Sequence, residues 1–147
     1  MDPQTLVPEL SSPEIQAFAT GFPVMLLHAA VTILLLLAGA TLYALLTPWK
    51  EIALIREGNA AAAVAFGGVL VGLAIPLAVS LSVSHSVREI AIWGAATVVL
   101  QLLTFRLTDA LLTGLPQRIR EGEISAAVLL VAAKLAVALV LAAAVTG

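Results

Sequence analysis

Three ionisable side chains lie in stretches that are otherwise apolar enough to cross a membrane. Arg106 and Asp109 are three positions apart in the third such stretch, and Lys134 stands about eleven residues into the fourth. Residues three apart on a helix are neighbours, so Arg106 and Asp109 can pair. A charged group inside a bilayer is costly, which makes each of the three a candidate functional residue. We expect Asp109 to be shared by Arg106 and Lys134, leaving a site of net positive charge.

Depth along the helices places these groups near the middle of the membrane. At about 1.5 Å per residue from the charged end of each helix, Asp109 lies about 14 Å deep, Lys134 about 17 Å and Arg106 about 18 Å. Gln101 lies near the centre, where an interhelical hydrogen bond is the ordinary role of an amide. Three interpretations stay open for the trio: an ion or solute pathway, a structural salt bridge, or a contact that locks an oligomer.

A polar stripe runs along the same predicted helix at spacings of four, three and four. At about 100° per residue, Arg106 and Asp109 point roughly away from this stripe. One face is therefore expected to meet the bundle interior, and the other a neighbouring subunit or lipid. The stripe consists of Thr97, Gln101, Thr104 and Thr108.

Composition identifies the chain as an integral membrane protein. It has 147 residues, of which 61% are hydrophobic and 11% charged, and its net charge is −2. Long charge-free runs exceed the roughly 20 apolar residues needed to cross about 30 Å of hydrocarbon. The absence of cysteine excludes disulfides and thiolate metal sites, and the absence of a basic cluster argues against nucleic acid. The acidic start, with no basic residue before the first apolar run, does not fit a cleavable signal peptide.

A repeated tetrad organises the chain. Residues 55–58 read Ile-Arg-Glu-Gly, and residues 119–122 repeat this sequence 64 positions later. Each copy lies between two apolar runs and therefore forms a charged hinge. The fold class that follows is an all-α integral membrane protein of four transmembrane helices, arranged as two tandem helical hairpins. Because each unit has two spans, the units insert the same way round as parallel repeats.

The expected boundaries follow from the hinges. Residues 1–20 form an extracytoplasmic N-terminal tail with one short interfacial turn near 15–20, since Ser12, Pro13 and Glu14 resemble a helix start. The first repeat covers 21–84, with spans 21–46 and 59–82 around a first hinge at 47–58. The second repeat covers 85–147, with spans 90–115 and 123–146 around a second hinge at 116–122.

The hinges also predict orientation. Four basic residues lie in them, whereas the opposite side offers only Arg88. The positive-inside rule therefore places both hinges in the cytoplasm and both termini outside. A glycine C-cap and an asparagine N-cap are expected where the first hinge meets the next helix. The candidate hinge residues are Arg56, Glu57, Gly58, Asn59, Arg120, Glu121 and Gly122.

Small residues mark a packing face on the second span. Ala61, Ala65, Gly68 and Gly72 alternate at spacings of four and three, and the Gly68/Gly72 pair permits close approach of another helix. Pro76 is expected to kink the same helix. We expect either the Gly68/Gly72 face or the Arg106/Asp109 face to form subunit contacts in a homo-oligomer.

Several of these residues resemble a known family. Thr47-Pro48, Ile55-Arg56 with Gly58-Asn59, Gly67-Gly68 and the run from Ile75 to Ala78 look like the first half of the YjfL-like family of bacterial inner-membrane proteins, domain of unknown function 350. The resemblance continues through Trp93-Gly94, residues 101–103, Ile119, Gly122 and Ala126-Ala127, and covers roughly residues 20 to 147. It implies a bacterial inner-membrane protein of unassigned activity. The fourth span departs from the family pattern, which has a Gly and an Asn near its end.

No motif for an enzyme, a cofactor or a metal site is recognisable. The sequence has no phosphate loop after a strand, no nucleophile elbow and no zincin helix, and His28 and His85 match no ligand motif. We expect a small polytopic protein of the bacterial inner membrane, a homo-oligomeric permeation or transport subunit for an ion or small solute. The alternative is a membrane scaffold whose two cytoplasmic hinges dock a peripheral partner.

Overall fold

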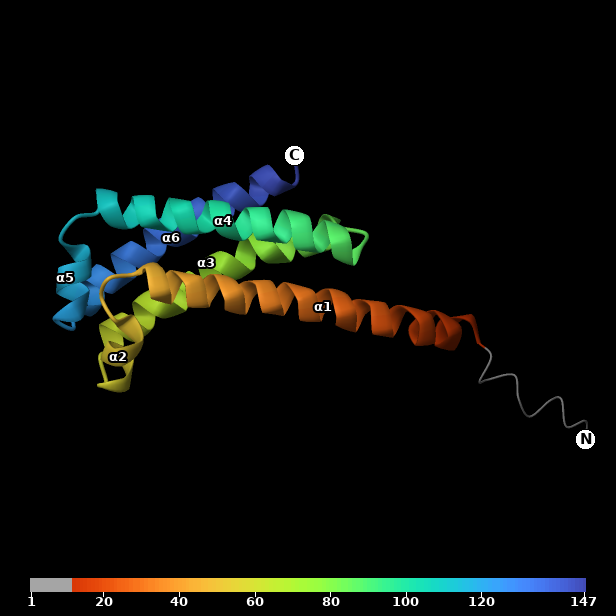
Figure 1. Ribbon diagram of the computed structural model, residues 1–147, viewed down its shortest axis with the longest axis horizontal. Coiled ribbons are helices and arrows are strands. Elements are labelled where there is room, and N and C mark those ends of the chain that lie inside the picture. The colour runs from red at the N-terminus through yellow and green to blue at the C-terminus, as the bar shows by residue number, and fades with distance from the viewer. Residues whose placement is uncertain (1–11) are drawn as a thin grey trace, which may run out of the picture.

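The computed structural model describes residues 12–147, which contain six α-helices and no strand (Figure 1). Four are long and apolar enough to cross a membrane, so the chain has the architecture of a polytopic membrane protein. The other two are six-residue helices, one in each hinge. The long helices are α1 (Pro13–Leu46), α3 (Ala60–Val83), α4 (Val87–Leu111) and α6 (Ile124–Val145), and the short ones are α2 (Glu51–Arg56) and α5 (Leu115–Arg120).

Helix α1 begins earlier than the sequence analysis expected. The Ser12 hydroxyl accepts a hydrogen bond from the backbone N–H of Ile15 at 3.4 Å, and Pro13 occupies the first turn. From this cap α1 continues without interruption to Leu46, so the separate turn predicted at 15–20 is wrong. The chain between Ile15 and Gly21 has nothing to stop a helix once it has started. The rest of the predicted tail, residues 1–11, lies outside the described residues.

Helix α4 ends earlier than expected, at Leu111. Gly114 has a φ of +88°, a left-handed conformation that glycine adopts without steric cost and that ends a right-handed helix. The chain then turns into α5, with Pro116 in its first turn. The last residues of the predicted third span, 112–114, therefore belong to the turn before α5.

The two hinges share one backbone geometry. Gly58 and Gly122 both have a φ of +89°, and both follow a short helix. The N–H that follows each glycine donates to a carbonyl five residues earlier, at 2.9 Å in each hinge. This is the Schellman arrangement, in which a left-handed glycine ends a helix and the freed carbonyls regain partners. The next long helix begins two residues after each glycine.

Asn59 ties the hinges together. Its Oδ1 accepts a hydrogen bond from the Ala62 N–H at 2.9 Å and so caps α3, as predicted. Its Nδ2 donates to the carbonyls of Ile119 and Arg120, both at 3.1 Å. One side chain therefore starts the second long helix and holds the distant hinge against the first.

The most extensive helix packing joins α3 and α6, which cross beneath α1 and α4 in Figure 1. The predicted small-residue face of α3 is buried, as expected. A Cβ on Gly68 would lie 2.4 Å from Cγ2 of Val131 on α6, and a Cβ on Gly72 2.6 Å from Cζ of Phe105 on α4. This face is thus buried within the chain, which removes the Gly68/Gly72 alternative for a subunit contact; the oligomer itself stays a prediction. Helix α3 remains continuous through Pro76.

A candidate buried ion site

Lys134 and Asp109 meet in the interior of the bundle. The Nζ of Lys134 on α6 lies 2.8 Å from Oδ1 of Asp109 on α4, and the two side chains are 1% and 4% exposed. The same Nζ donates a hydrogen bond to the hydroxyl of Tyr43 on α1, at 2.7 Å. Three helices therefore converge on one ammonium group. The contact between Lys134 and Asp109 predicted from the sequence is confirmed.

Two aromatic rings complete the surroundings of the ammonium. Lys134 Nζ lies 4.7 Å from the ring centroid of Tyr43 and 5.4 Å from that of Phe105. The rings meet edge to face, with centroids 6.2 Å apart. A cation within about 6 Å of an aromatic face is attracted by the ring quadrupole. The site therefore offers Lys134 one carboxylate, one hydroxyl and two nearby aromatic rings.

The Asp109 carboxylate keeps unused hydrogen-bonding capacity. Its Oδ1 is held in the ion pair with Lys134 at 2.8 Å. Its Oδ2 is buried and has no hydrogen-bond partner among residues 12–147. Buried polar atoms are nearly always satisfied, so such an exception calls for an explanation. A proton, water or ion is the kind of species that this oxygen can accept.

Arg106 does not share Asp109, which corrects the predicted three-way arrangement. Among the described residues, no carboxylate oxygen lies within 4.0 Å of its guanidinium. Its Nη1 is buried without a hydrogen-bond partner from residues 12–147, although the residue as a whole is half-buried. The reason is geometric, because the Asp109 side chain is directed to Lys134 on α6.

Glu51 is a second buried carboxylate, which no sequence pattern singled out. It is 4% exposed at the start of α2, and its Oε2 has no hydrogen-bond partner among residues 12–147. Burial raises the pKa of Glu51 to about 7, and the charge of Asp109 raises it further, while Lys134 acts in the opposite direction. Because Glu51 brings a second acid beside the pair, the expected net positive charge is offset whenever Glu51 is ionised.

The sequence did contain a signal for these missed residues. Glu51 stands among Lys50, Arg56 and Glu57, which suggests the solvated side of a surface helix. However, Tyr43, the only tyrosine, lies four residues before Thr47 and eight before Glu51. Residues four apart share a helix face. Tyr43, Thr47 and Glu51 are all buried, although Pro48 separates the helices that carry them.

The site lies beside the second hinge. Asp109 is two residues from the end of α4 at Leu111, about 3 Å inside that helix. A pocket of about 280 Å³ reaches it from the hinge side. A second pocket of about 390 Å³ adjoins it, and Trp49 and Arg120 line both. Asp109 is therefore the member of the pair nearer to an opening.

Gln101 lies deeper along α4 and is fully buried. Neither its Oε1 nor its Nε2 has a partner within residues 12–147, so the predicted interhelical hydrogen bond is absent from this part of the chain. The buried face of α4 is broader than predicted, because Thr97, Gln101, Thr108 and Asp109 all face the interior. The expectation that Asp109 points away from the polar stripe is wrong.

The charged hinge residues face outward. Arg56, Glu57, Arg120 and Glu121 are all exposed, and the glycines beside them serve as helix caps. In residues 12–147, no group of three or more His, Cys, Asp or Glu side chains is arranged to hold a metal. The ionisable cluster of Glu51, Asp109 and Lys134 is thus the strongest candidate site in the described chain.

Comparison with known proteins places this architecture in a family. Residues 17–145 match the model of the Domain of Unknown Function DUF350. The chain belongs to this family. This DUF350 protein is 33% identical over 95 residues to the UPF0719 inner membrane protein YjfL of Escherichia coli strain K12, a match covering 65% of this chain and 72% of YjfL. The YjfL of Escherichia coli O157:H7 matches equally. No solved structure matches the chain.

Proposed function

We propose that this DUF350 protein is a multi-pass subunit of the bacterial inner membrane that passes an ion or small solute, with Asp109 and Lys134 as its binding site. One observation carries the proposal: a buried ion pair whose carboxylate keeps one oxygen, Oδ2, without a partner, beside a second buried carboxylate, Glu51, whose Oε2 is also unpartnered. Ionisable groups within membrane helices commonly mark substrate, ion or proton routes. The matched YjfL proteins, described as inner membrane proteins, support the location.

The proposed tandem repeat strengthens this assignment. Helices α2 and α5, like α3 and α6, begin 64 residues apart, the same offset as the repeated tetrad. At this offset, the first-half counterparts of Asp109 and Lys134 are Leu45 and Leu70. A hairpin of this design therefore does not need the charged pair in order to form. The cost of burying two charges is better explained by activity than by architecture.

Two further features fit a transport route: a pocket that reaches Asp109 and a buried amide deeper along α4. The hinge-side pocket reaches Asp109, and the unpartnered amide of Gln101 lies eight residues back along α4, about 12 Å away. A four-helix bundle encloses little volume, so we propose a homo-oligomer. The N-terminal half of α1 extends past the other helices and leaves an apolar surface for a second copy (Figure 1). The excess of Lys and Arg in the hinges supports a topology with the hinges in the cytoplasm and both termini outside.

Flux measurements on the full chain in liposomes test the proposal. Separate assays follow protons, Na⁺, K⁺ and small anions in the parent, in Lys134→Ala and in Asp109→Asn/Lys134→Met. The double variant removes both charges and so leaves no unpaired buried ion, which keeps it folded. We expect both variants to lose flux, whereas Lys50→Gln, an exposed control, retains it. Unchanged flux in the folded double variant, or no flux in the parent, would refute the assignment.

The scaffold alternative draws on the exposed hinges. Arg56, Glu57, Arg120 and Glu121 are exposed in two hinges that Asn59 holds together. Such a charged surface suits a peripheral partner. In the same flux assay, Arg56→Glu separates the two functions, since Arg56 lines neither hinge-side pocket and a transport subunit retains flux when only its docking surface is reversed.

A further inference from the structure

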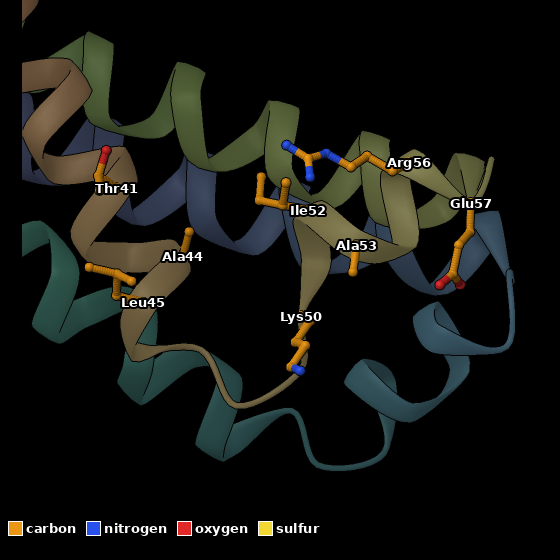
Figure 2. A pocket seen from close by; sticks show the side chains of 8 residues that line it. All are labelled: Thr41, Ala44, Leu45, Lys50, Ile52, Ala53, Arg56 and Glu57. Atoms are coloured by element: carbon orange, nitrogen blue, oxygen red, sulfur yellow. The ribbon is translucent and has the colours of Figure 1, made fainter.

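A groove lies on the outer side of α2, apart from the ion site. It occupies about 550 Å³ between the last turns of α1 and the helix α2, within the roughly 300–1,000 Å³ of small-molecule sites. Figure 2 shows its lining side chains, none of which belongs to the Glu51, Asp109 and Lys134 cluster. The groove is thus a separate feature that the proposed transport role does not use.

The walls of the groove are apolar and continue into the membrane-facing surface. Ala44 and Leu45 of α1 and Ile52 of α2 line it. Leu45 is 76% exposed, and Leu37 two turns earlier on α1 is also exposed, so an apolar track runs from the groove along α1. In a membrane-spanning helix, such a track is covered by acyl chains. The groove therefore opens onto lipid.

The rim of the groove carries two cations that have no protein partner. Neither Lys50 nor Arg56 makes an ion pair or side-chain hydrogen bond within residues 12–147. Figure 2 shows Arg56 extending back over Ile52, with Lys50 at the opposite edge. Glu57 also lines the groove, which leaves the rim with a net charge of +1.

Arg118 in the second hinge provides the contrast. It donates two hydrogen bonds to Glu123. These hydrogen bonds from Arg118 lower the pKa of the Glu123 carboxyl to about 2. Arg118 is thus neutralised within the chain. Arg56 has no such carboxylate partner among residues 12–147 and is free to meet an external anion.

We propose that this groove binds an anionic glycerophospholipid, with an acyl chain along Leu45 and Ile52 and its phosphate at Arg56. Guanidinium and phosphate match in a bidentate geometry, and basic pockets beside membrane helices recognise anionic head groups. Lys50 at the other edge adds to the attraction. The site is distinct from the proposed transport site, so either assignment can fail without the other.

Quenching of tryptophan fluorescence by brominated lipid tests this assignment. The full chain carrying Trp93→Phe keeps Trp49, the neighbour of Lys50, as its only tryptophan. It is reconstituted into phosphatidylcholine vesicles in which brominated phosphatidylglycerol, or brominated phosphatidylcholine, is varied. A basic residue near an anionic membrane surface is worth about five-fold in affinity. We expect quenching at Trp49 to show at least about a five-fold preference for phosphatidylglycerol.

Three variants decide the outcome. Lys50→Gln/Arg56→Gln should reduce the preference to near unity, whereas Arg118→Gln, which removes a cation already paired with Glu123, should retain it. A Trp49→Phe chain reports from Trp93 and should show no preference. Equal quenching by both lipids, or a preference that survives in Lys50→Gln/Arg56→Gln, would overturn the proposal. An equal loss in Arg118→Gln would do the same, because it would indicate a general surface charge.

Discussion

Replacing Gly68 by alanine is the most direct test of how α3 and α6 are held together. The added Cβ would lie 2.4 Å from Val131 Cγ2, 2.8 Å from its Cγ1 and 3.0 Å from its Cβ. Favourable carbon contacts lie at about 3.5–4.0 Å, so all three contacts are far too short. Valine on a helix has one strongly preferred χ1 rotamer and cannot swing aside. The helices must therefore move apart by roughly 1 Å, judged from that contact distance.

The cost follows from two opposing terms. Overpacking of this kind typically destabilises a protein by about 1–3 kcal/mol. Alanine gains up to about 1 kcal/mol over glycine from helix propensity. The neighbouring Gly67 supplies a matched control, because a Cβ there meets nothing within 4 Å. Gly67→Ala should thus be neutral or stabilising, and the two adjacent variants should differ by roughly 1–3 kcal/mol, the overpacking cost alone.

Unfolding in mixed micelles, with increasing sodium dodecyl sulfate and helicity followed by circular dichroism, measures this difference. Val131→Ala in the Gly68→Ala background removes both clashing methyl groups and should restore most of the lost stability. If Gly68→Ala unfolds at the same denaturant fraction as Gly67→Ala, or Val131→Ala fails to rescue it, then the described α3–α6 contact is not the one that holds the bundle.

Two further predictions concern the hinges. Burial raises the pKa of Glu51 to about 7 from an ordinary 4.5, so its stabilising proton is fully bound below about pH 4.5 and is lost as the pH rises through 7. The free energy of unfolding, measured from pH 5 to 8, should fall by up to roughly 3 kcal/mol. Glu51→Gln should flatten this pH dependence. If the variant keeps the slope of the parent, Glu51 is not the group responsible. Asn59→Ala loses the cap on Ala62 and the bonds to Ile119 and Arg120, and should cost about 2 kcal/mol in the same assay. Asn59→Asp keeps the cap and loses only the bridge, so equal costs for the two variants would refute the bridge.

Sequence patterns predicted well those features that local chemistry decides. The Asn59 cap, the left-handed glycines and the small-residue face of α3 all depend on residues within a few positions of one another. The pairing of Lys134 with Asp109 was also predictable, because two opposite charges in neighbouring apolar helices have few other ways to be satisfied. These features required no knowledge of how the four long helices are placed.

Features that depend on packing between distant segments were not predictable. Burial of Glu51 results from the way α2 turns against the bundle after Pro48, and nothing in its charged neighbours indicates this. The role of Gly68 within the chain, rather than between chains, depends on Val131 lying opposite it, 63 residues away. The early end of α4 at Leu111 depends on Gly114 adopting a left-handed conformation, which the leucine-rich sequence around it did not suggest.

The hydrogen bonds from Asn59 to the second hinge have a consequence for biosynthesis. When the first hairpin has entered the membrane, the amide nitrogen of Asn59 has no carbonyl to receive its hydrogen bonds, because residues 119 and 120 have yet to be made. These hydrogen bonds form only once the second hinge has reached the same side of the bilayer. A second hairpin inserted in the opposite orientation would leave the Asn59 amide without these two hydrogen bonds. All three hydrogen bonds of Asn59 can thus form only when the two hinges lie together on one side of the bilayer.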